Sequence, residues 1–104
     1  MTKLFVETTD YNYQPPVDIS LLKIHEWMNP IIVCARQGQK KRLVNLQRLG
    51  LIRNTIKVVG WWDLGGEAME SLFQYDAIFL LDPERISIPK VKEQWDRLIS
   101  CLQR

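Results

Sequence analysis

The fold is decided by the segment PIIVCARQGQKKR, residues 30–42, in which an apolar run gives way to a polar loop and then to a basic helix start. Residues 31–35 are apolar or small, a pattern typical of a short strand that is buried on both faces of a sheet. Arg36, Gln37 and Gly38 then leave the carboxyl end of this strand. Because open α/β sheets place their ligand crevices at the carboxyl ends of strands, this loop is the first candidate for a binding site.

Three further segments have the composition of strands. Residues 3–8 contain β-branched and aromatic residues between two charges, residues 56–59 are rich in isoleucine and valine, and residues 77–81 form a second uninterrupted apolar run.

Four segments are expected to be helices. The last one starts near Ser87 and has the clearest periodicity, since apolar residues recur at helical spacing as far as Leu102, while Glu93 and Arg97 stand four residues apart on its polar side. A glycine at position 50 is expected to end the second helix in the left-handed conformation. The first three helices are predicted over residues 18–28, 39–49 and 67–74, with an apolar side formed by Leu21, Ile24, Trp27, Met28, Leu43, Leu46, Leu49, Met69, Leu72 and Phe73.

The element order β-α-β-α-β-α-β-α predicts a small α/β domain over residues 1–104: a three-layer sandwich around a four-stranded, mainly parallel sheet. The alternative is an α+β fold. In that fold residues 56–62 and 73–81 form a hairpin, and the helix over residues 67–74 is reduced to a loop.

Composition indicates an ordinary globular protein, with 46% hydrophobic and 25% charged residues in a chain of 104. A net charge of +2 is too small to predict bulk attraction to nucleic acid or membranes, although a local patch could still matter. The isolated Cys34 and Cys101 are expected to be buried thiols in a reducing compartment. No apolar run has the length of a membrane span, so we expect a soluble, cytoplasmic protein with no membrane partner.

If the strands are parallel, the loops after them meet at one edge of the sheet. The start of the second helix carries the cations Arg36, Lys40, Lys41 and Arg42. Each cation at this end is unfavourable by roughly 0.3–1 kcal/mol because of the helix dipole, and a bound phosphate, solvation or a neighbouring acid would offset this cost. Trp61 and Trp62 should point to opposite faces, leaving one indole at the rim, where it could stack on a base. The candidate ligand-binding residues are therefore Arg36, Gln37, Lys40, Lys41, Arg42, Trp62, Asp63 and Asp82.

No motif identifies a cofactor, a metal site or a catalytic group. The glycine spacings of phosphate-binding and dinucleotide-binding loops are absent, and His25 has no partner at a metal or triad spacing. Asp10, Asp63 and Asp82 each follow a strand and could hold Mg²⁺ through phosphates, but aspartates at such positions are more typical of turns.

Three functions remain open. The first is a binding module for a phosphate-bearing ligand, either a nucleotide or a nucleic acid, at the carboxyl edge of the sheet. The second is a protein-interaction module or a subunit of a homo-oligomer, anchored by Tyr11, Tyr13 and Trp61. The third is a small enzyme that acts on a nucleotide-like substrate through the aspartates.

Overall fold

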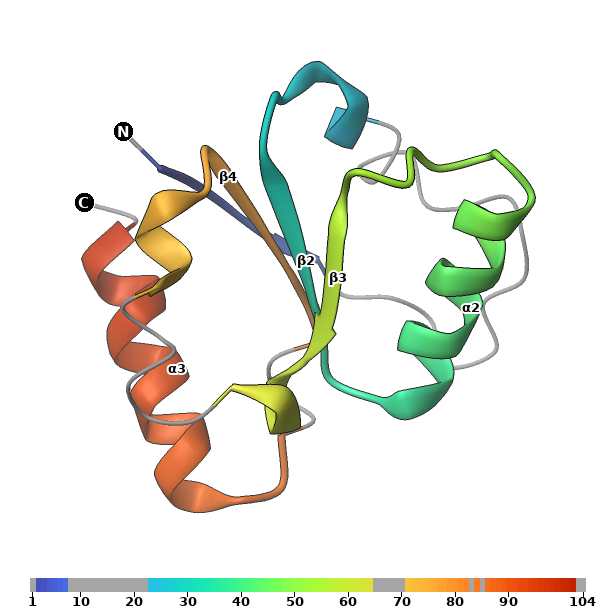
Figure 1. The fold of residues 1–104 in the computed structure, drawn as a ribbon. Coiled ribbons are helices and arrows are strands. Elements are labelled where there is room, and N and C mark those ends of the chain that lie inside the picture. Colours follow the sequence, from blue (N-terminus) through green and yellow to red (C-terminus); the bar gives the residue numbers. More distant parts are fainter. Residues whose placement is uncertain (1, 8–22, 65–70, 83, 85, 103–104) are drawn as a thin grey trace.

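A computed structural model gives the fold and describes residues 2–7, 23–64, 71–82, 84 and 86–102. Its centre is one sheet of four parallel strands in the order β1-β4-β2-β3 (Figure 1). The strands are β1 (Lys3–Glu7), β2 (Pro30–Cys34), β3 (Lys57–Gly60) and β4 (Ala77–Leu81). All four strands were predicted, and the parallel pairing confirms the α/β class. The α+β alternative is wrong because β3 and β4 are separated by β2 and both run parallel to it.

The two central strands are the two uninterrupted apolar runs. Every residue of β2 and of β4 is buried, as expected for strands covered on both faces. Ala77 of β4 is level with Lys3 of β1 and with Pro30 of β2, so these three strands begin at the same height.

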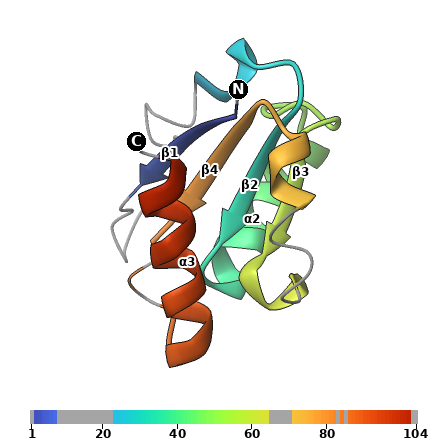
Figure 2. The ribbon, with the colours of Figure 1, turned by 90° about the vertical axis from the view of Figure 1, so that its left-hand side faces the viewer.

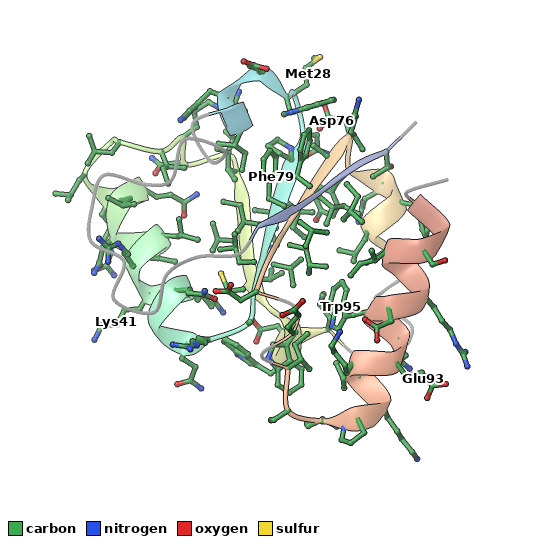
Figure 3. All side chains as sticks on the ribbon, turned by 180° about the vertical axis from the view of Figure 1, so that it is seen from behind. Met28, Lys41, Asp76, Phe79, Glu93 and Trp95 are labelled. Atoms are coloured by element: carbon green, nitrogen blue, oxygen red, sulfur yellow. The ribbon has the colours of Figure 1, made fainter. Side chains whose placement is uncertain are left out.

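Two helices cover opposite faces of the sheet. Helix α2 (Gln37–Arg48) packs on one face and helix α3 (Pro89–Leu102) on the other (Figures 1 and 2). Alternate side chains of β2 enter the two cores: Ile32 lies in the cluster with Leu43 of α2, whereas Ile31 lies in the cluster with Trp95 of α3. Figure 3 shows the two layers filled by side chains, with Phe79 in one and Trp95 in the other. The three-layer prediction is thus confirmed.

Helix α3 matches its predicted pattern closely. Val91, Trp95 and Ile99 pack in the cluster on its face of the sheet. On the polar side, Arg97 Nη2 donates to Glu93 Oε1 at 3.0 Å, which confirms the expected pair four residues apart.

Helix α2 begins two residues earlier than predicted. The side-chain oxygen Gln39 Oε1 accepts hydrogen bonds from the backbone amides of Ala35 (3.0 Å) and Arg36 (3.2 Å), which satisfies donors that precede the helix. Gly50 follows the helix with φ +77°, as predicted. Leu49 is exposed, against expectation, because the helix ends at Arg48 and Leu49 begins the turn that follows it.

The first predicted helix, over residues 18–28, is represented among the described residues by a short 3-10 turn, η1 (Lys23–Glu26). Ile24 is fully buried as expected, but Met28 is 91% exposed and its assignment to the apolar side was wrong. The cause is Asp76, whose carboxylate accepts hydrogen bonds from the backbone amides of Met28 (2.8 Å) and Asn29 (3.1 Å) and so turns the chain toward β2.

The third predicted helix is also replaced where the structure describes it. Residues 71–74 form a 3-10 turn, with Leu72 buried and Phe73 exposed, so the prediction for Phe73 was wrong. In a turn with three residues per repeat, the adjacent side chains of Leu72 and Phe73 point to different sides, so only one of them packs in the core. Met69 and Leu21 lie outside the described residues.

In the part of the chain that the structure describes, no helix combines the length and apolarity needed to cross a membrane.

Candidate functional site

The carboxyl ends of the four strands lie at one edge of the sheet because all pairings are parallel. From this edge β2 continues into α2 on one face, while its neighbour β4 leads to α3 on the other (Figure 2). Two adjacent strands whose connections leave on opposite faces define the point where α/β sheets usually open a crevice.

The chain fills this point with its own side chains. Asp82, the residue after β4, is 3% exposed and has φ +44°, a left-handed conformation that few residues other than glycine adopt. Gln39 Nε2 donates to Asp82 Oδ2 at 2.7 Å, while Gln39 Oε1 binds the amides at the start of α2. The predicted ligand residue Asp82 therefore joins the end of β4 to the start of α2.

The short 3-10 turn η2 (Trp61–Asp63) is held against the start of α2 by two side chains. Trp61 Nε1 donates to the carbonyl oxygen of Ala35 at 3.1 Å, and Lys40 Nζ forms an ion pair with Asp63 Oδ2 at 2.8 Å. The same oxygen accepts from the Gly60 amide at 2.9 Å. The bond from Lys40, and next the bond from Gly60, keep the pKa of Asp63 below its usual value of 3.8, so this carboxylate is ionised at neutral pH.

Trp62 lies directly over Gly60. A Cβ atom at position 60 would overlap the six-membered part of the Trp62 indole, so the ring occupies space that a side chain would otherwise take. The backbone of Gly60 is extended, with φ −96° and ψ 155°, which any residue can adopt. Glycine is therefore needed here for the close approach of the ring. Trp61 meets Trp62 edge to face, with ring centroids 6.0 Å apart.

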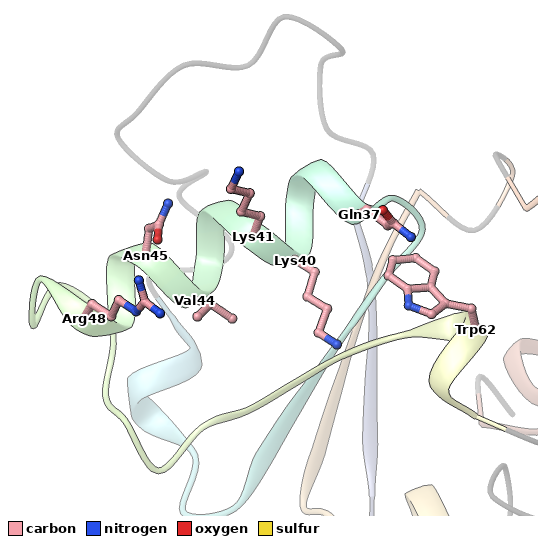
Figure 4. Close-up of a pocket in the computed structure, with 7 residues that line it drawn as sticks. All are labelled: Gln37, Lys40, Lys41, Val44, Asn45, Arg48 and Trp62. Atoms are coloured by element: carbon pink, nitrogen blue, oxygen red, sulfur yellow. The ribbon is translucent and has the colours of Figure 1, made fainter.

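An open groove of about 460 Å³ lies between the outer side of α2 and Trp62 (Figure 4). Two rows of helix residues at four-residue spacing form its floor, because positions i, i+4 and i+8 share one side of a helix. The residues that line it are Gln37, Lys40, Lys41, Val44, Asn45, Arg48 and Trp62.

The groove brings together four of the predicted ligand residues: Gln37, Lys40, Lys41 and Trp62. Sequence reasoning missed Val44, Asn45 and Arg48 as site residues. The four-residue spacing of Lys41 and Asn45, and of Lys40, Val44 and Arg48, was the signal that could have found them.

The other predicted residues lie elsewhere. Arg36 and Arg42 are half-buried and do not line the groove. Asp63 lines a second hollow of about 430 Å³ beside β3, which Lys40 also borders, so the Lys40–Asp63 pair stands between the two. Trp61 packs in the core cluster on the α3 side. Tyr11 and Tyr13 lie outside the described residues.

The charges of the chain are strongly segregated. Between Glu26 and Asp63 the chain has seven basic residues and no acidic residue. This segment builds β2, α2 and β3, one half of the sheet with its helix. The net charge of +2 therefore conceals a highly basic half, a feature typical of chains that bind polyanions. The seven residues are Arg36, Lys40, Lys41, Arg42, Arg48, Arg53 and Lys57.

Nucleophilic and metal chemistry find no support among the described side chains. Burial raises the pKa of the Cys34 thiol to about 12, so the thiol stays protonated and inert at neutral pH. The described residues contain no group of three His, Cys, Asp or Glu side chains placed to hold a metal ion.

Comparison of the chain with protein-family models, curated proteins and solved structures gave no match.

Proposed function

We propose that the chain binds a phosphate-bearing ligand in the groove beside α2. The observation that carries the proposal is the meeting of three cations, Lys40, Lys41 and Arg48, with the indole of Trp62 around one open groove. None of the described residues that line this groove is acidic. An anion placed there gains most from Lys41 and Arg48, since Lys40 is paired with Asp63 outside the groove wall.

The cations have different roles in this proposal. Lys41 and Arg48 are exposed side chains on the same side of α2, and the planar guanidinium of Arg48 can bind two phosphate oxygens at once. Lys40 is already paired with Asp63, so it contributes a weaker positive field and fixes the position of η2. The amides of Gln37 and Asn45 add hydrogen-bond donors and acceptors.

Trp62 supplies the aromatic half of the site. Its ring rests on Gly60 and lines the groove near Gln37 (Figure 4). A nucleotide base that stacks on the ring would bring its phosphate toward the lysines, and stacking of this kind contributes about 1–3 kcal/mol per base.

The test is a titration of the protein with inorganic tripolyphosphate and with adenosine triphosphate, followed by tryptophan fluorescence and by calorimetry. The double variant Lys41→Glu/Arg48→Glu should abolish the response. A matched control, Lys3→Glu/Lys90→Glu, makes the same change in net charge at exposed positions of β1 and α3, and should leave binding nearly intact. Equal losses in the two double variants would reduce the effect to overall charge and refute the groove.

A further inference from the structure

We infer that the phosphate-bearing ligand is a single strand of nucleic acid, which lies along α2 with one base stacked on Trp62. This inference rests on the proposed function and narrows its ligand from any phosphate compound to one class of polymer.

The cations of the groove are spread along helix α2. Lys41 and Arg48 are seven residues apart, which at 1.5 Å per residue places their Cα atoms about 10 Å apart along the helix axis. Trp62 stands at the opposite end of the groove from Arg48 (Figure 4). A ligand that uses both ends must therefore extend beyond one phosphate group, as the repeating backbone of a strand does.

The backbone amides just before α2 are already occupied. Compact nucleotides are usually held by backbone amides that wrap around their phosphates. Here the amides of Ala35 and Arg36 are occupied by the side chain of Gln39, which is itself bonded to Asp82. Lys41 and Arg48 are instead exposed side chains about two turns apart on the helix, an arrangement suited to an extended backbone.

The groove also has an open shape. Sites for small molecules enclose most of the ligand, whereas this groove is open and has one helix and one indole as its walls. Open basic grooves with an aromatic platform are typical of proteins that bind single strands. Stacking on Trp62 also requires a base whose face is free, which a single strand offers and the interior of a duplex does not.

The basic character continues beyond the groove at Lys57, an exposed residue that begins β3 in the acid-free segment. Arg53 of the same segment is half-buried and donates from Nη2 to the carbonyl oxygen of Trp27 at 2.6 Å, so its guanidinium is engaged within the protein. A longer strand, unlike a mononucleotide, can contact a cation outside the groove as well as the cations that line it.

The experiment compares ligands of one chemistry and different length. Oligothymidylates of two, four and eight nucleotides, thymidine monophosphate and an eight-base-pair duplex are titrated against the full chain while anisotropy and tryptophan fluorescence are recorded. Affinity should rise with length up to the octamer, and the octamer should bind more tightly than the duplex. With two to three phosphates neutralised, the logarithm of affinity should fall with that of salt at about −0.7 per phosphate, a loss of about 7- to 18-fold between 50 and 200 mM.

Two variants test whether a base stacks on the Trp62 indole. Trp62→Ala should weaken octamer binding about 5- to 150-fold, while Trp62→Phe should retain most of it. Circular dichroism of both variants establishes that they fold, and Trp62→Phe keeps the test valid should the alanine variant fail to do so.

The possible failures are distinguishable. If thymidine monophosphate binds as tightly as the octamer, or the duplex binds more tightly than the single strand, this inference is refuted while the proposed function stands. If neither the oligonucleotides nor tripolyphosphate binds, both are refuted.

Discussion

Replacing Gly60 by alanine tests the geometry on which the groove depends. The new Cβ would overlap the Trp62 ring, so the indole or the strand end must move. Overpacking of this kind typically destabilises a protein by about 1–3 kcal/mol. The backbone at position 60 is extended and suits alanine, so the substitution should have no backbone cost.

The decisive comparison is the same substitution in a Trp62→Ala background. Without the indole the clash is gone, and replacing glycine by alanine at a compatible position stabilises a protein by about 0.4–1 kcal/mol because it restricts the unfolded chain. The sign of the effect should therefore reverse, with a coupling free energy between the two positions of at least about 1.4 kcal/mol.

The free energy of unfolding of the unchanged protein, Gly60→Ala, Trp62→Ala and the double variant is measured by urea denaturation, which is followed by far-ultraviolet circular dichroism. Gly38→Ala is the matched control. Gly38 lies in α2, and a Cβ atom added there would meet nothing within 4 Å. This substitution should raise stability in either background by about 0.4–1 kcal/mol. Equal destabilisation by Gly60→Ala with and without Trp62 would refute the view that the indole excludes a side chain there.

Three further outcomes are expected. Asp63→Asn should lower the urea midpoint at neutral pH but not in strong acid. The folded pKa of Asp63 lies below 3.8, so the stabilising contribution of the carboxylate is present above that pH and is lost as pH falls through the lowered pKa. A difference in urea midpoint that does not depend on pH would contradict this account. Asp82→Ala should lower the free energy of unfolding by about 1–3 kcal/mol, because the Gln39 amide loses its acceptor and alanine disfavours positive φ; a neutral result in thermal melts would contradict it. Phe79→Ala should cost about 3–5 kcal/mol by urea denaturation, since the ring is fully buried and stacks on Phe5 with centroids 4.7 Å apart; a loss below 1 kcal/mol would show that the core collapses around the gap.

Much of the fold was predictable because its strongest signals are local. The uninterrupted apolar runs at residues 31–35 and 77–81 predicted the two central strands, β2 (Pro30–Cys34) and β4, and the helical spacing from Val91 onward predicted α3. Strand order was not predictable, since periodicity records which face of an element is buried but not which neighbour covers its edge.

The errors have a common physical cause in contacts between distant residues. Met28 continues the apolar stripe of Ile24, yet the Asp76 carboxylate, 48 residues away, binds its backbone amide and ends the helical path. No local pattern could show that bond.

The candidate site was predicted in part. Lys40 and Lys41 were singled out as a run of adjacent cations together with Arg42, but a helix turns neighbours in sequence to different sides. Arg42 is therefore half-buried away from the groove, while Arg48, about two turns after Lys41, lines it. Spacing along the helix is a better guide to a shared surface than adjacency in the chain.

The place of β4 in the sheet has a consequence for biosynthesis. Strands β1 and β2 do not pair with each other, because β4 lies between them and pairs with both. Pairs such as Leu4 with Ile78 therefore connect positions more than seventy residues apart. During synthesis on the ribosome, β1 has no strand to pair with until residues 77–81 emerge from the exit tunnel. The unit β2-α2-β3, by contrast, pairs residues only 26 positions apart and can assemble earlier. The surface that we assign to the ligand would thus take shape before residues 77–81 leave the exit tunnel.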